Sequence, residues 1–93
     1  MVIGVCTLDI YLPTTRSLKD KRRIVKSMID RIRSKFNVSI SELENQDVWG
    51  QATLGMAIIT TDSTYAQQVL RAAAKIFDQY VEAEVYRLSV EIL

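Results

Sequence analysis

The sequence predicts one α+β domain, residues 1–93, in which two helices cover one face of a four-stranded antiparallel sheet. Four segments have the alternation and β-branched content of strands, and two have apolar residues at helical spacing. They follow one another in the order β-α-β-β-α-β, without repeats or linkers. The chain has 93 residues, 48% of them hydrophobic, which suits one domain with a small core.

The first strand and the first helix have the clearest signals. Over residues 2–12 the side chains alternate as in a strand with one fully buried face. Ser17 and Asp20 resemble a capping box, which marks the start of a helix. Apolar residues behind them recur at helical spacing, which predicts an amphipathic helix over residues 18–35, with Asn37 at its C-terminal cap.

A hairpin is predicted after the first helix. Val38 and Ile40 mark a second, more polar strand. Residues 44–50 form a polar loop that carries the only tryptophan, Trp49. A third strand is predicted over residues 52–61, where alternate side chains are again apolar.

A second helix and a last strand complete the chain. The helix is predicted to start at Asp62 or Ser63, because either side chain can cap it. Its apolar stripe consists of Ala66, Val69, Leu70, Ala73, Ile76, Phe77 and Tyr80. The strand is predicted over residues 84–93. Its core-facing side chains are expected to be Tyr86, Leu88, Val90 and Ile92.

This order of elements is that of the ferredoxin-like sandwich, an antiparallel sheet of strand order 4-1-3-2 with both helices on one face. In that topology the first helix starts at the same end of the sheet as the hairpin between strands two and three. We therefore expect Trp49 to lie at the same end as the cations of residues 19–23.

Composition removes several classes of function. The chain has one cysteine, Cys6, and no histidine, so we expect neither a metal site nor a cofactor. Cys6 faces the predicted core and should be inert. A lone cysteine and the lack of a signal-peptide pattern indicate a cytoplasmic protein. The longest uncharged stretch, residues 48–61, is too short to span a membrane.

Positive charge is concentrated in residues 16–35. This segment holds nine cations and two carboxylates, a net charge of +7, whereas the whole chain has a net charge of +1. Cations in the first turn of a helix oppose its dipole at a cost of about 0.3–1 kcal/mol each, which favours an anion site over a merely solvated helix face. The predicted anion-binding residues are Arg16, Lys19, Lys21, Arg22, Arg23, Lys26 and Trp49.

Trp49 has two interpretations. In the polar loop its ring could stack on an unpaired base or anchor a protein partner. Alternatively it folds back as a lid over the small core, because large aromatic side chains are usually mostly buried.

The face of the sheet away from the helices is a second candidate surface. It lacks the stacking aromatic set of an RNA-recognition motif, and its apolar character favours a homodimer or another protein partner. Asp9 on this face is expected to pair with a neighbouring cation. The residues expected there are Ile3, Val5, Thr7, Tyr11, Ser39, Thr53, Gly55, Ala57, Ile59, Val85, Arg87 and Ser89.

A phosphate-handling enzyme is the third possibility. Acylphosphatases share the predicted fold and bind phosphate in the loop after the first strand with backbone N–H groups and an arginine. The chain has Arg16 in that loop, but no glycine to build a backbone cradle. We therefore expect no catalytic activity.

Three blocks of sequence resemble one known family. They are SLKDKRRIVKS at residues 17–27, FNVS at residues 36–39, and QDVW followed by ATLG at residues 46–55. Together they resemble the YlxP-like family of small bacterial proteins, a domain of unknown function. The resemblance implies a ferredoxin-like fold. Members are often encoded beside translation-initiation and ribosome-maturation factors, which implies an RNA or ribosomal partner.

We therefore expect a non-catalytic cytoplasmic accessory protein that binds RNA or a ribosomal subunit through its basic first helix. The alternative is a protein-interaction or homodimerisation module that uses the open face of the sheet. No membrane partner is expected.

Overall fold

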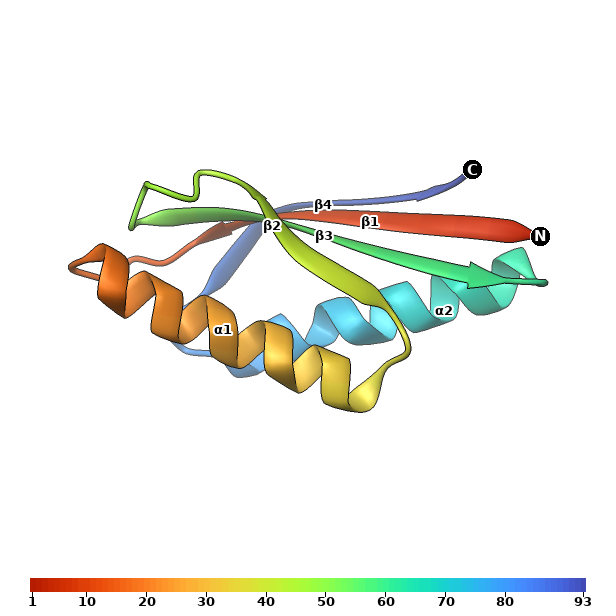
Figure 1. Ribbon diagram of the computed structural model, residues 1–93, viewed down its shortest axis with the longest axis horizontal. Helices are drawn as coiled ribbons and strands as arrows, with labels where there is room; N and C mark the ends of the chain where they lie inside the picture. The colour runs from red at the N-terminus through yellow and green to blue at the C-terminus, as the bar shows by residue number, and fades with distance from the viewer.

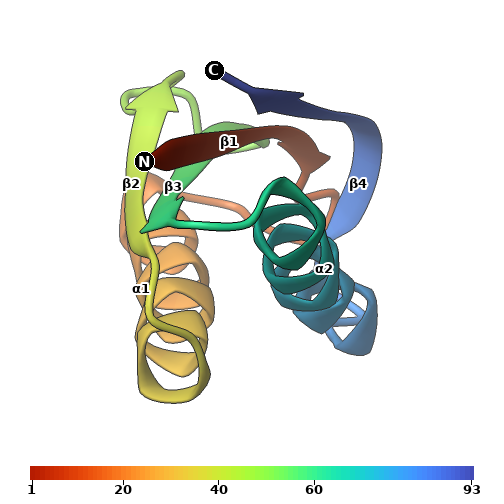
Figure 2. The ribbon, with the colours of Figure 1, turned by 90° about the vertical axis from the view of Figure 1, so that its right-hand side faces the viewer.

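The computed structural model describes all residues, Met1–Leu93. Two helices lie on one face of a four-stranded antiparallel sheet (Figures 1 and 2). The elements are β1 (Val2–Tyr11), α1 (Leu18–Lys35), β2 (Ser39–Glu44), β3 (Gln51–Thr60), α2 (Ser63–Ala74), the short 3-10 helix η1 (Lys75–Gln79) and β4 (Glu84–Ile92). The strand order β2-β3-β1-β4 is the predicted order 4-1-3-2 read from the other edge. The predicted α+β class, element order and antiparallel sheet are confirmed.

Side-chain caps define where both helices begin. The Ser17 hydroxyl accepts a hydrogen bond from the Asp20 N–H at 3.1 Å, and the Asp20 carboxylate accepts one from the Arg16 N–H at 3.3 Å. Asp62 caps α2 by accepting from the Thr64 N–H at 3.1 Å. Both predicted starts are therefore confirmed, and these caps satisfy amides that have no partner within the helix.

The end of α1 differs from the prediction. Phe36, in extended conformation, is the C-terminal cap residue, and its N–H donates to the Ile32 carbonyl at 2.9 Å. The predicted cap at Asn37 is wrong because no left-handed residue is needed there: the chain leaves the helix directly in the extended conformation that leads into β2.

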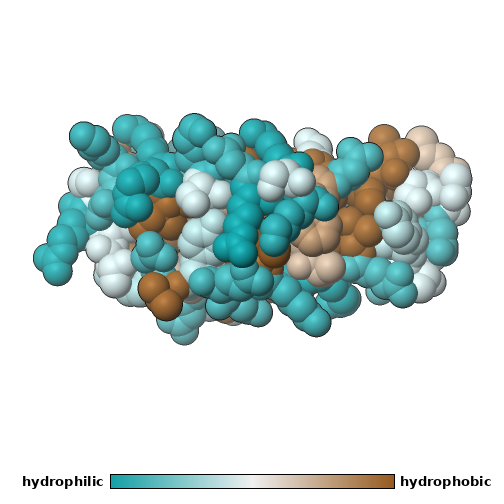
Figure 3. Space-filling model, turned by 90° about the horizontal axis from the view of Figure 1, so that it is seen from below, coloured by the Kyte–Doolittle hydropathy of each residue, from teal (hydrophilic) through white to brown (hydrophobic).

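The core lies between the sheet and the helices. Nineteen buried hydrophobic residues form one cluster, to which β1 contributes Cys6, Leu8 and Ile10. The outer surface of the helix layer is mostly hydrophilic, with a few hydrophobic patches (Figure 3). No helix is both long enough and apolar enough to cross a membrane.

The register of β4 corrects two predicted orientations. Pairing with β1 shifts after Asp9, which lies opposite Arg87, so Tyr86 is an extra residue in a β-bulge. The Tyr86 ring stacks on Tyr11 of the open face, with ring centroids 4.2 Å apart. The prediction that Tyr86 faces the core is therefore wrong. The same shift turns Val85, predicted on the open face, towards the helices.

Candidate anion-binding site

The loop between β2 and β3, residues 45–50, packs against the segment that enters α1. The Leu12 N–H donates to the Gly50 carbonyl at 2.9 Å. The buried Thr15 hydroxyl lies within hydrogen-bond distance of the carbonyl oxygens of Leu12 and Trp49, which share its single proton. These contacts confirm that Trp49 and the start of the basic helix lie at the same end of the molecule.

Lys21 is buried rather than available to an anion. Its side chain is 1% exposed, its Nζ lies 2.8 Å from Glu42 Oε2, and it donates to the Asn45 carbonyl oxygen. The prediction that Lys21 contacts an anionic partner is wrong, because its ammonium group is used inside the fold. The burial of Lys21 was detectable from the sequence. Lys21 precedes Ile24 and Val25 by three and four residues, so it lies on the apolar stripe of α1.

The Lys21 ion pair joins three parts of the chain. Glu42 belongs to the edge strand β2, and Asn45 begins the loop with a left-handed backbone, φ = 63°. The contact with Glu42 is an ion pair by distance, although it lacks the alignment of a hydrogen bond. A buried ammonium needs such partners, so this arrangement fixes α1 against β2 and the loop. Sequence reasoning missed Glu42 and Asn45, since no local pattern marks a partner so far along the chain.

The other predicted cations of α1 and the preceding loop are exposed. Arg23 Nη2 lies 3.4 Å from Asp20 Oδ1, and Lys26 Nζ lies 2.6 Å from Asp30 Oδ2. Because these pairs are exposed, each contributes little to stability and competes only weakly with a ligand. Among the predicted anion-binding cations, Arg16, Lys19 and Arg22 form no ion pair.

A groove of about 500 Å³ separates α1 from β2. Arg22, Lys26 and Arg33 are the cations that line it, and its apolar lining includes Ile29 and Ile40. Arg33 Nη2 donates to the Ile40 carbonyl at 3.0 Å, so this carbonyl group of the edge strand β2 already has a partner. Asp30 and Glu42 also line the groove, so it presents three cations and two carboxylates between one helix and the outer edge of the sheet.

The indole of Trp49 is exposed rather than part of the core. Its residue is 48% exposed, and it borders a shallow hollow with Asp47, Val48 and Gly50. The interpretation of Trp49 as a lid over the core is therefore wrong. Its ring is free to contact a base or another protein, while its carbonyl group anchors the loop.

The predicted burial of Cys6 and the predicted ion pair of Asp9 are confirmed. Cys6 is buried, and burial raises the pKa of its thiol, with the charge of Arg71 acting weakly in the opposite direction. Asp9 Oδ2 lies 3.6 Å from Arg87 Nη1, and Asp9 also accepts a hydrogen bond from the Thr53 hydroxyl at 2.7 Å. Neither group is arranged as a nucleophile.

The comparisons with known proteins agree with the resemblance. Residues 3–90 match the family described as "Protein of unknown function (DUF503)". The chain is also similar to "Uncharacterized protein YlxP" of Bacillus subtilis (strain 168). The two are 31% identical over 83 residues, which cover 89% of this chain and 90% of that protein. The chain therefore belongs to the DUF503 family of proteins of unknown function.

Proposed function

We propose that this chain is a non-catalytic accessory protein of ferredoxin-like fold that binds RNA, free or in a ribosomal subunit. The observation that carries the proposal is the exposure of Arg16, Lys19 and Arg22, which form no ion pair, at the same end as the half-exposed Trp49. A phosphate backbone is a polyanion that such cations neutralise with release of counterions. An exposed indole adds a stacking surface for an unpaired base.

The loop between β1 and α1 supports a binding role rather than phosphoryl chemistry. The Thr15 N–H donates to the Leu12 carbonyl at 3.2 Å, and the Arg16 N–H donates to the Asp20 carboxylate at 3.3 Å. These two amides are therefore engaged within the chain and do not form an open cradle for a phosphate. Arg16 supplies a charge there without the backbone donors that a phosphate-handling enzyme needs.

A salt series with matched variants tests the proposal. Fluorescence anisotropy with a labelled ribosomal RNA fragment should show affinity falling with salt by about 0.7–0.9 log units per log unit of salt for each phosphate contact. Arg22→Glu should weaken binding and flatten this dependence. Lys35→Glu is the matched control, because it makes the same charge change at an exposed cation in the last turn of α1.

The proposal fails if no RNA or ribosomal subunit binds at low salt. It also fails if Arg22→Glu and Lys35→Glu weaken binding equally, since the loss would then reflect net charge alone. A Trp49→Ala variant separates stacking from electrostatics: we expect it to weaken binding without changing the salt dependence.

The open face of the sheet supports homodimerisation as a second candidate function. A hollow there has Val5, Thr7, Gly55 and Ala57 in its lining, and Ile59 is strongly exposed. Apolar surface of this kind usually marks association. Sedimentation analysis should then show a dimer that Ile59→Lys converts to a monomer, and a wild-type monomer at high concentration would exclude this candidate.

A further inference from the structure

The helix layer leaves part of β4 uncovered. Leu88 lies directly opposite Leu8 in the β1–β4 register, so both side chains point towards the helices. Leu8 is fully buried, whereas Leu88 is 40% exposed. The prediction that Leu88 faces the core is thus right in direction, but no element of the chain covers it completely.

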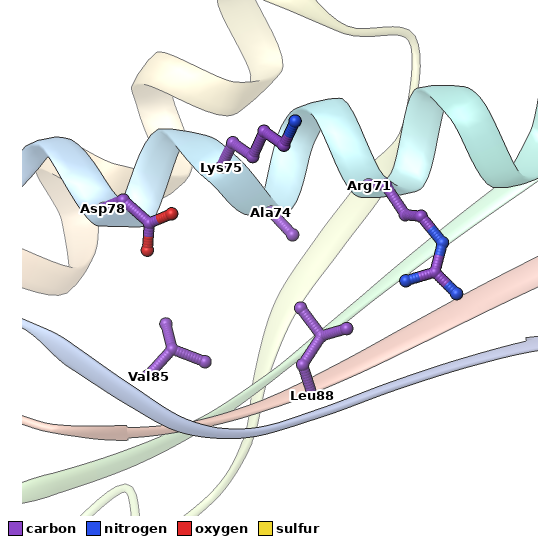
Figure 4. A pocket seen from close by; sticks show the side chains of 6 residues that line it. All are labelled: Arg71, Ala74, Lys75, Asp78, Val85 and Leu88. Carbon is purple, nitrogen blue, oxygen red and sulfur yellow. The ribbon is translucent and has the colours of Figure 1, made fainter.

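A cavity of about 200 Å³ lies beside Leu88, between β4 and the α2–η1 helices (Figure 4). Ala74, Val85 and Leu88 supply its apolar lining, and it has a charge at each end. Arg71 extends towards Leu88, and Asp78 lies above Val85 (Figure 4). Arg71 and Asp78 are seven positions apart, roughly 10–12 Å along the helix axis.

The charged groups at this cavity have no ion-pair partners. Arg71, Lys75 and Asp78 take part in none of the four ion pairs of the chain. Arg71 and Lys75 lie near the C-terminus of α2, where cations interact favourably with the helix dipole. The dipole does not explain why Leu88 is exposed or why the Asp78 carboxylate has no cation beside it. Lys75 also lines the cavity, and its side chain extends along the helix towards Arg71 and away from β4 (Figure 4). The cavity therefore offers an apolar centre between a positive end at Arg71 and a negative end at Asp78.

The backbone of β4 is free next to the same cavity. β4 is an edge strand, and the Leu93 N–H donates to the Ile3 carbonyl at 2.8 Å. Because hydrogen-bonded pairs alternate along an antiparallel ladder, the backbone groups of Leu88, Val90 and Ile92 point away from β1. An edge with unpaired amides and carbonyls is a template for one more strand.

We propose that β4 binds an extended segment of a partner protein by strand addition, with the pattern acidic–x–apolar–x–basic. Alternate residues of a strand lie on one face, about 6.7 Å apart, so three of them span the charged ends of the cavity. β4 runs from the Asp78 end to the Arg71 end. An antiparallel partner therefore meets Arg71 first, which places its acidic residue before its basic one.

The partner is a different protein rather than a second copy. No segment of this chain has an acidic residue, an apolar residue and a basic residue at positions i, i+2 and i+4. A second copy would therefore pair with the edge without matching its charges.

Peptide binding followed by NMR tests this proposal. The probe is a capped heptapeptide with Glu, Leu and Lys at positions two, four and six and Thr elsewhere, and its control has Glu and Lys exchanged. The probe should shift the amide signals of Leu88 and Val90 and bind about tenfold more tightly than the control, from two exposed charge pairs. Arg71→Glu combined with Asp78→Lys should reverse this preference, whereas Lys35→Glu should leave it unchanged.

Three results would overturn the proposal. The first is equal binding of the two peptides, and the second is a preference that the double variant does not reverse. The third is a protein that, without peptide, sediments as a dimer and whose Leu88 and Val90 amides are already protected from hydrogen exchange. A second copy of the chain would then occupy the edge of β4. Peptide binding can be measured independently of RNA binding, because Arg71 and Asp78 lie outside α1, which carries the proposed RNA contacts.

Discussion

Replacing Lys21 with methionine tests how the basic helix is attached to the sheet. Methionine has a similar length and volume, so the change removes the charge and its contacts without opening a large cavity. It leaves the Glu42 carboxylate without its cation and the Asn45 carbonyl without its donor. Removing one partner of a fully buried pair costs about 3–5 kcal/mol.

The structure places the expected loss at the lower end of that range. Lys21 is 1% exposed but the Glu42 side chain is 20% exposed, so water can partly solvate the carboxylate left behind. We expect the free energy of unfolding to fall by about 3 kcal/mol. For a domain of this size, this corresponds to a drop in Tm of roughly 12–24 °C.

Urea denaturation followed by circular dichroism measures this loss, with two matched controls. Lys26→Met removes a pair whose lysine is 77% exposed and should cost less than about 1 kcal/mol. The double variant Lys21→Met with Glu42→Leu should be more stable than Lys21→Met alone, because no unpaired charge remains. The reasoning is wrong if Lys21→Met costs no more than Lys26→Met, or if the double variant is not rescued.

Further predictions concern the glycines and the cysteine. Gly4→Ala should cost about 1–3 kcal/mol in urea denaturation, because the added Cβ would lie 3.0 Å from Leu70 in the packed core. Gly55→Ala should cost less, because its closest contact, at 2.6 Å, is the end of the exposed Leu43 side chain, which can move. Burial raises the pKa of Cys6, so the unfolded chain releases this proton first as the pH rises past 9.0, and the stability of the folded state falls. A Cys6→Ala variant should lose less stability over that pH range, and native Cys6 should resist alkylation until the protein unfolds.

Elements with strong local signals were predictable from the sequence. The bounds of α1 match the prediction over residues 18–35 because a capping residue and an apolar stripe mark the helix. The common end shared by Trp49 and α1 followed from topology alone. These features depend on interactions within a few residues or on the order of elements.

The missed features depend on pairing between distant segments. The bulge at Tyr86 arises from the register between β1 and β4, which alternation along one strand does not contain. The burial of Lys21 agrees with its place on the apolar stripe. The Glu42 carboxylate that compensates its buried charge, however, belongs to β2. The exposure of Trp49 depends on how its loop docks, through Thr15, onto the segment before α1.

Side-chain contacts also reduce the charge available for binding. Of the nine cations in residues 16–35, Lys21 is buried, and Arg23 and Lys26 face carboxylates of the same helix. Arg31 donates to Gln79 and lies 5.8 Å from the centre of the Tyr80 ring, and Arg33 is bonded to β2. Of the six predicted cations, Lys21 is lost to the interior, Arg23 and Lys26 are weakly held by exposed pairs, and Arg16, Lys19 and Arg22 are unpaired. The salt dependence of binding should therefore reflect about three to five phosphate contacts rather than six.

The two proposed contact surfaces lie at opposite edges of the sheet. Arg22, one of the proposed RNA contacts, lines the groove that borders β2, which is one outer strand, and the proposed peptide site follows β4, which is the other. Two inner strands separate these edges by roughly 14 Å, since neighbouring strands are about 4.8 Å apart. A partner strand added to β4 would extend the sheet away from α1, and an RNA along α1 would leave the edge of β4 free. One copy of the chain could therefore hold an RNA and a protein segment at the same time, because neither partner would cover residues that the other needs.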